Sequence, residues 1–264
     1  MAFDVNNFVI DHVLRGVMTS SADGSVMWSI NQIAEPSLSV TTETTDVVDA
    51  LGSKITSFDR AKNAEFSANN SLFDLGLYAA QNGTDKEVAG DNVEIIVTPA
   101  FETIDVTDET TVELKNVPNA QIKEIFKLKG DGTLGERYAL SDSATDKTFV
   151  HAEGEKTITL PTGLVKGNQV FVMYEYEATS AVAVNGDAIN FPKSGKFIME
   201  VLGTDVCDTE TLIHAYIVFP NAKLDGNVDV SFTSEGNHPF VIRANQAYCD
   251  SKKRLFSVII PEEK

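Results

Sequence analysis

Residues 212–236 read LIHAYIVFPNAKLDGNVDVSFTSEG, and apolar and polar side chains alternate along both halves of this stretch. In the second half, Val228, Val230 and Phe232 fall on one face of an extended chain, and Asp229 and its alternate neighbours fall on the other. A period of two predicts β-strands. The Pro-Asn and Asp-Gly pairs predict turns. The stretch therefore predicts two strands, each with one face available to a core.

Most of the chain outside this stretch also reads as short strands separated by turn-forming residues. The further candidate strands are 37–45, 55–69, 92–98, 110–117, 122–128, 156–160, 169–178, 195–203, 239–244 and 254–260. Many antiparallel strands and one short helix predict an all-β fold, either a sandwich or a barrel. We expect one β-domain over residues 1–264, with an elaboration or insertion at about 101–161, where charges and turns are denser.

The segment 46–58 predicts a hairpin whose tip is the sequence DALGS at 49–53. Gly52 can adopt a positive φ in such a tip.

The sequence NSLFDLGLYAAQNG at 70–83 predicts the helix. Ser71 and Asp74 have capping-box spacing, and Gly83 stands where a helix C-terminal glycine is favoured. A stripe at helical spacing is expected to face the core. It consists of Leu72, Leu75, Tyr78 and Ala79. Gly76 inside the helix predicts close packing against a flat neighbour such as a sheet.

The charge of the chain excludes several classes of partner. Its 264 residues include 21 basic and 39 acidic side chains, which give a formal net charge of −18. Binding of DNA or RNA through phosphate neutralisation needs a basic surface. Docking on an anionic membrane needs one as well. An acidic surface instead keeps subunits soluble and lets nucleic acid pass without adhering.

The sequence contains no apolar run of a bilayer-spanning length and no basic, apolar start of the kind found in signal peptides. We therefore expect synthesis in the cytoplasm. Cys207 and Cys249 lack the spacing of a zinc motif, and we expect two free thiols in a reducing compartment.

No constellation for catalysis, metal binding or cofactor binding is present. The four histidines, none at a metal-ligand spacing, are His12, His151, His214 and His238. His214 is expected in a strand, and His238 in a loop before Pro239. Nucleophile-elbow and phosphate-binding glycine motifs are absent, and GDGTLGE at 130–136 predicts a hairpin turn. We expect no enzymatic activity and no cofactor.

Three parts of the chain together resemble the tail tube proteins of tailed bacteriophages, of the type found in phages of Gram-positive hosts. The first is TETTDVVDALGSKITSFDRAKNAEFSANNSLFDLGLYAAQNG at 42–83. The second is FPKSGKFIMEVLGTDVCD at 191–208, and the third is the stretch 212–250 followed by a terminal LFSVIIPEE. The middle of the chain is less similar to this family.

The resemblance implies a β-sandwich or barrel with one flanking helix. Six copies would join their sheets around a ring-wide inner β-barrel, and rings would stack into a tube in the virion tail. DNA would pass through the lumen during ejection without specific binding, and no membrane would be contacted. The implied partners are other copies of the chain, the tape-measure, baseplate or tail-tip and terminator proteins, and, in a contractile tail, a sheath protein.

Charge and the resemblance together give candidate residues for the lumen or for ring stacking. Asp46 and Asp49 lie in the predicted hairpin, and Asp229 lies on the polar face of a predicted strand. An acidic lumen would repel phosphate, so DNA would slide.

Two other interpretations remain open at this point. The chain could be the inner tube of a contractile bacteriocin-like particle, or a capsid decoration protein that binds a host surface. A hydrolase on a β-scaffold is the least supported alternative, because the sequence shows no cluster of catalytic side chains.

Overall fold

The computed structural model describes residues 7–206, 208–233, 237–248 and 251–262, and these residues form two compact units. The first unit comprises residues 1–86 and 184–264, and the second comprises residues 87–183. In the described ranges almost all regular structure is β, with one helix, so the predicted all-β class is confirmed. The segment 101–161, expected as an elaboration, lies within the second unit. No helix in the described part of the chain is long and apolar enough to span a bilayer.

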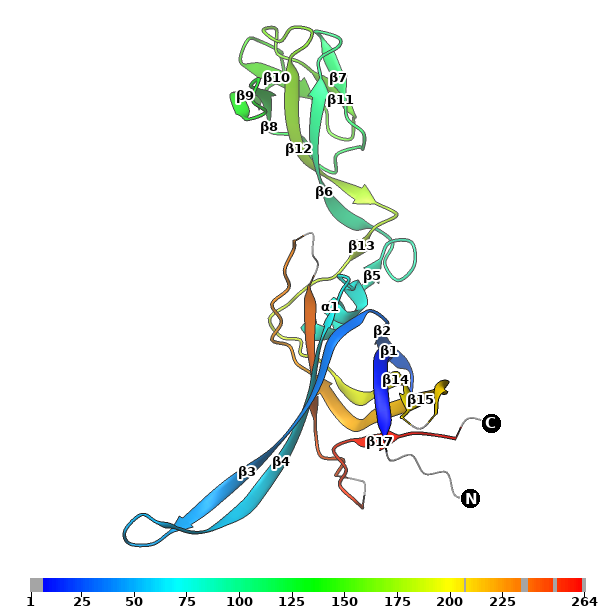
Figure 1. Ribbon diagram of the computed structural model, residues 1–264. Coiled ribbons are helices and arrows are strands. Elements are labelled where there is room, and N and C mark those ends of the chain that lie inside the picture. The colour runs from blue at the N-terminus through cyan, green and yellow to red at the C-terminus, as the bar shows by residue number, and fades with distance from the viewer. Residues whose placement is uncertain (1–6, 207, 234–236, 249–250, 263–264) are drawn as a thin grey trace. The chain divides into compact units, whose positions relative to one another are not determined.

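The first unit consists of one eight-stranded sheet and the helix (Figure 1). Its elements are β1 (Phe8–Ser20), β2 (Val26–Ile30), β3 (Ile33–Val48), β4 (Lys54–Asn70), α1 (Leu75–Asn82), β14 (Ser194–Asp205), β15 (Asp208–Leu224), β16 (His238–Ala244) and β17 (Ser257–Ile259). The order across the sheet is β2-β1-β14-β15-β16-β4-β3, with β17 paired to β15.

This sheet curls into a nearly closed barrel, and the connectivity explains why. Strands β2 and β3 stand at opposite ends of the strand order, yet only residues 31 and 32 connect them. A flat sheet of this width would hold its edges several strand spacings of about 4.8 Å apart. The short connection therefore requires the two edges to approach each other.

An aromatic core fills the concave side of the barrel. Trp28 packs against Phe197 at 5.7 Å between ring centroids and against Phe240 at 6.3 Å. Phe66 and Phe219 extend this contact across the sheet. These side chains come from five strands, so their burial stabilises the packing of all five strands.

Helix α1 flanks the barrel, as predicted, but its start and its buried face differ from the prediction. Asp74, and not Ser71, is the N-cap, because its side chain accepts a hydrogen bond from Leu77 N–H. Ala79 is buried as predicted, and Leu75 and Tyr78 are half-buried. Leu77, which was not predicted, is fully buried, whereas Leu72 lies before the helix with 61% of its surface exposed. Gly83 ends the helix at φ 72°, as predicted.

The stretch that opened the sequence analysis folds differently from the prediction. Strand β15 continues through Pro220 to Leu224, because Pro220 and Asn221 together face a single residue of β14. Such a bulge tolerates proline, since the ladder there needs no donor. Of the strand predicted over 227–234, the described residues 227–233 form only an isolated bridge at Ser231. The chain leaves the sheet at Asp225, which accepts from Asn227 N–H and pairs with Arg243 at 2.7 Å.

The second unit has its own sheet and its own apolar core. Its strands are β5 (Glu87–Val88), β6 (Ile96–Asp105), β7 (Thr111–Glu113), β8 (Glu124–Leu128), β9 (Leu134–Leu140), β10 (Thr148–His151), β11 (Thr157–Thr159), β12 (Gln169–Ala178) and β13 (Val182–Ala183). Seven of them form a sheet in the order β6-β12-β8-β9-β10-β11-β7, and β5 pairs with β13. Ile125, Phe149 and Val170 are fully buried in its core.

Candidate functional site

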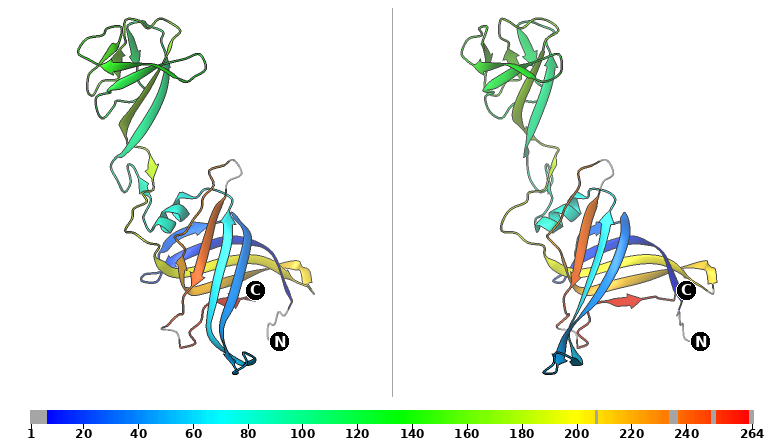
Figure 2. Two further views of the ribbon diagram at one scale, coloured as in Figure 1. Left: turned by 90° about the vertical axis from the view of Figure 1, so that its left-hand side faces the viewer. Right: turned by 60° about the vertical axis from the view of Figure 1, so that its left-hand side comes forward.

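The most unusual surface of the first unit is the β3–β4 hairpin, which extends well past the core (Figures 1 and 2). Alternate residues of β4 are buried only from Ala64 onward, and residues 54–63 are exposed on both faces of the strand. No residue of β3 is buried. A two-stranded ribbon without a covering layer is marginally stable in water. The exposed part of the hairpin is therefore a candidate for contact with another molecule.

The tip of this hairpin is fixed by its own hydrogen bonds. Asp49 N–H donates to Ser53 O at 2.8 Å, and Asp49 Oδ1 accepts from the N–H groups of Leu51 and Ser53 at 2.9 and 2.8 Å. Gly52 has φ 83°, as the predicted turn requires. The result is a defined turn that leaves Leu51 92% exposed.

Apolar side chains are exposed around this tip. Val48 and Ile55 flank Leu51, and Val47 and Phe58 follow along the ribbon, all of them largely solvent-exposed. Arg60 lies over the Phe58 ring at 5.5 Å. Exposed apolar clusters of this kind mark interaction sites. Sequence analysis located the hairpin but missed these residues, although the loss of strict alternation after position 46 is a signal that could have revealed them.

Asp46 takes part in a polar contact across the hairpin. Its carboxylate accepts from Ser57 Oγ at 2.6 Å and pairs with Lys54 at 3.0 Å. The hydrogen bond from Ser57, followed by that from Lys54, lowers the pKa of Asp46 below its usual value. Asp46 therefore stays ionised at neutral pH.

The structure brings Asp46 and Asp49 together but places Asp229 elsewhere. Asp229 is exposed in the connection between β15 and β16. That connection leads to His238, which pairs with Asn70 at the end of β4, whereas the tip precedes Lys54 at its start. The nearby Phe232 packs against Phe73 at 5.5 Å, on the helix side of the barrel.

His238 is a buried strand residue and not a loop residue, so that prediction was wrong. Its Nδ1 accepts from Asp74 N–H at 3.3 Å, and its Nε2 lies 2.7 Å from Gln81 Oε1. Burial lowers the pKa of His238, and the Asp74 charge opposes this effect only in part. Gln81 Nε2 also donates to Pro239 O. The cluster fastens helix α1 to β16.

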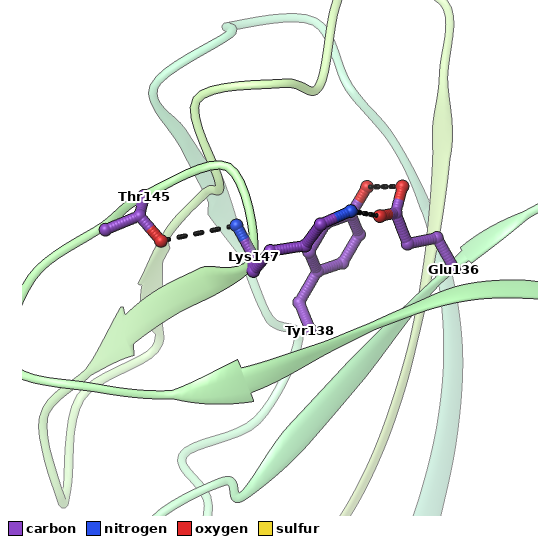
Figure 3. A network of polar contacts seen from close by, with 4 residues as sticks. All are labelled: Glu136, Tyr138, Thr145 and Lys147. Carbon is purple, nitrogen blue, oxygen red and sulfur yellow. Dashed lines mark hydrogen bonds and ion pairs between the residues drawn. The ribbon is translucent and has the colours of Figure 1, made fainter.

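A second polar network lies in the second unit (Figure 3). Glu136 accepts a hydrogen bond from Tyr138 Oη at 3.0 Å and forms an ion pair with the side chain of Lys147. The backbone N–H of Lys147 donates to Thr145 Oγ1. Burial, followed by the Glu136 hydrogen bond, raises the pKa of Tyr138 to about 12. These contacts join β9 to the segment before β10.

The remaining histidines also have structural partners. His214 lies in β15, as predicted, with Nδ1 3.0 Å from Glu200 Oε1. His151 is buried and bonded to backbone groups of Ile122 and Glu155. Within the described ranges, no group of three or more His, Cys, Asp or Glu side chains is arranged to hold a metal. Cys207 and Cys249, expected as free thiols, lie outside the described residues.

A family model described as the YomU/Tube protein family matches residues 8–246 of the chain. This match spans both compact units and the β3–β4 hairpin. No curated protein matches the sequence.

Proposed function

The chain belongs to the YomU/Tube protein family, and on this premise we propose that it is a virion protein whose rings stack into the tail tube of a phage. The observation that carries this proposal is the β3–β4 hairpin, a long ribbon exposed on both faces with an apolar tip. A contact between the tip of one copy and a different surface of the next is heterologous, and such contacts build open filaments.

The sheet edges support closure of each ring. Strand β3 is an edge of the first unit's sheet, 16 residues long, and β2 is the other edge. Long exposed edges invite pairing with another chain, and closure into a barrel removes them. The two edges approach each other within one subunit, but β2 has only 5 residues and β3 has 16. We propose that the part of β3 that extends beyond β2 pairs with a neighbouring subunit and so contributes to the ring-wide inner barrel. The ring number of six follows from the resemblance to tail tube proteins.

The acidic charge supports a role as a conduit for DNA. The formal charge of −18 is repeated in every subunit of the ring, so a lumen lined by part of it would repel phosphate. We assign Asp46 and Asp49 to the stacking hairpin because they flank its exposed tip. Asp229 remains a lumen candidate by virtue of its charge and exposure. Tape-measure, tail-tip and terminator proteins are the proposed partners at the tube interior and ends.

Negative-stain electron microscopy of the concentrated full-length protein at moderate salt tests this proposal. We expect hollow tubes with a regular axial repeat. Leu51→Asp places a charge at the exposed tip and should abolish tubes without changing the unfolding midpoint. Leu134→Asp, at a half-exposed leucine of the second unit, is the matched control and should assemble normally.

Compact closed particles or trimers would instead support the decoration protein interpretation. Tubes that form equally well from the Leu51→Asp variant would remove the hairpin from the stacking contact.

A further inference from the structure

A groove on the first unit lies where the β3–β4 hairpin leaves the buried part of the barrel. Its cavity volume is about 760 Å³. It is lined by residues 60–63 of β4, by residues 244–246 at and after the end of β16, and by residues 253, 255 and 256 before β17. The groove therefore joins three segments that are distant in sequence.

Three cationic side chains line this groove, and none of the described residues that line it is an aspartate or a glutamate. The cations are Arg60, Lys62 and Lys253, and all three are exposed. In the described ranges none of them forms an ion pair. The chain has 39 acidic side chains and only 21 basic ones, so this groove is opposite in sign to the protein as a whole. Its charge favours an acidic partner.

Irregular backbone supplies two of these cations. Arg60 is the extra residue of a β-bulge in the pairing of β3 with β4. A bulge re-aims a side chain away from the regular alternation of the strand. Lys253 has φ 51°, a left-handed conformation that is unfavourable for residues other than glycine. Such strain is typical of residues that a contact site needs in a particular position.

The hairpin itself does not neutralise Lys62. Lys62 pairs with Thr42 of β3, whereas Glu43 pairs with Ala61. Successive residues of a strand point to opposite faces, so Glu43 and Lys62 lie on opposite faces of the hairpin. Glu43 instead accepts a hydrogen bond from Asn63 Nδ2 at 3.4 Å.

The rest of the lining suits a polypeptide better than a nucleic acid. Leu255 and Phe256 provide apolar surface, and Phe256 is anchored against Phe219 at 5.8 Å between ring centroids. The side-chain amides of Asn245 and Gln246 can donate to and accept from a peptide backbone. A segment with carboxylates and apolar side chains would use all of these groups, whereas a phosphate backbone would use chiefly the cations.

The position of the groove indicates where such a segment comes from. Residues 61–63 of β4 pair with residues 41–43 of β3, and β3 is the sheet edge proposed above to pair with a neighbouring subunit. A subunit paired along this edge would stand next to the groove at a high effective concentration. With a net charge of −18, that subunit also carries many acidic side chains.

We propose that this groove binds an acidic segment of the neighbouring subunit in the same ring, with carboxylates of that segment against Arg60, Lys62 and Lys253. The inference rests on the proposed function. It concerns the contact around the ring, which is separate from the hairpin tip at 49–53 that is assigned to stacking. It also explains how subunits with the same net charge associate, because opposite charges meet at the groove.

Zero-length cross-linking tests the contact. Unlabelled and ¹⁵N-labelled full-length proteins are mixed and treated with a carbodiimide, which joins a lysine amine to a carboxylate in direct contact. Mass spectrometry identifies both residues and shows whether they come from two copies. We expect amides between Lys62 or Lys253 and an acidic residue of another copy. At about 0.1 mM protein their yield should be about tenfold above that of Lys123, an exposed lysine of the second unit, since docked groups reach effective concentrations of about 1 mM.

Two double variants separate the charge from the amine. Both are made together with Leu51→Asp, so that rings are measured without stacking. Lys62→Arg with Lys253→Arg keeps the cations, so it should lose the cross-link and still form rings. Lys62→Glu with Lys253→Glu should weaken ring formation in sedimentation velocity by about tenfold, as expected when two exposed ion pairs are lost. Lys123→Glu with Lys166→Glu makes the same change of charge on exposed lysines of the second unit and is the matched control.

Three results overturn the inference. The first is that amides of Lys62 and Lys253 stay within one copy or are no more frequent than those of Lys123. The second is equal ring formation by the Glu variant and its control. The third is binding of a short labelled oligodeoxynucleotide that the Glu variant loses, because the groove would then be a nucleic-acid site. If electron microscopy of the unaltered protein shows tubes in any of these cases, the proposed function survives without this contact. If it shows none, the proposed function fails as well.

Discussion

The imidazole of His238 lies 2.7 Å from the side-chain oxygen of Gln81, and both side chains are almost fully buried. The contact joins the first residue of β16 to the last turn of α1. His238 Nδ1 accepts from Asp74 N–H, so Nε2 carries the proton and donates to Gln81. A protonated imidazole cannot accept, so protonation would break the contact with the helix N-cap.

Stability of the first unit should fall in mild acid because of this cluster. The folded pKa of His238 is below the usual value of 6.5, so the unfolded state binds a proton first as pH falls. The resulting loss of stability begins below about pH 6.5 and is complete below the pKa of His238 in the folded state. We expect the unfolding midpoint, followed by fluorescence of the single tryptophan, Trp28, to decrease between pH 7 and pH 5.

His238→Phe should flatten this slope while lowering the midpoint at pH 8. His12→Gln removes an exposed imidazole and should leave the slope as in the unchanged protein. An unaltered slope in the Phe variant would show that another group causes the acid sensitivity.

Two glycines with positive φ should respond differently to alanine. Alanine at either Gly83 or Gly52 would have to adopt the left-handed conformation, which costs about 1–2 kcal/mol of folding free energy. A Cβ on Gly83 would also lie 2.4 Å from the backbone of Phe191, whereas nothing lies within 4 Å of one on Gly52. We expect Gly83→Ala to lower the free energy of unfolding by about 4 kcal/mol, in the exceptional range for one substitution. Denaturant titration of both variants is the measurement, and equal losses would contradict the close approach.

Buried tyrosines of the second unit should ionise late. Burial and the Glu102 carboxylate raise the pKa of Tyr174 to about 12, and burial and Glu136 do the same for Tyr138. The unfolded state loses these protons near pH 10, so stability should fall from about pH 10 to about pH 12. In an ultraviolet titration, a fraction of the tyrosines should ionise only near pH 12. Tyr138→Phe and Tyr174→Phe should each reduce this fraction. If the fraction that ionises near pH 12 is unchanged in both variants, other tyrosines account for it.

The second unit should be removable without unfolding the first. Val88 pairs with Val182, and Ala89 N–H donates to Ala181 O, so the two ends of the second unit are adjacent. Replacing residues 89–181 by Asn-Gly should close a short hairpin between β5 and β13. We expect the shortened chain to retain a cooperative transition with a buried Trp28. Loss of that transition would show that the barrel needs the second unit for stability.

Local pattern was enough to predict much of the fold. Alternation in 55–69 and 195–203 predicted strands, and the Gly83 terminus of the helix and the Gly52 turn were confirmed, because each depends on residues near one another in sequence. The resemblance to tail tube proteins agrees with the family match over 8–246. The type of host, the ring number and the roles of Asp46, Asp49 and Asp229 remain predictions.

By itself, therefore, the sequence determined the all-β class, the single helix, the hairpin and the acidic character of the surface. Only the tertiary structure decided which alternating segments pair. Residues 227–233 alternate well but form no regular strand, and the chain leaves the sheet at Asp225, which pairs with Arg243. His238 reads as a loop residue but is buried by Gln81, which lies 157 positions away. Burial and strand pairing depend on contacts between distant residues, and such contacts exist only once the chain has folded.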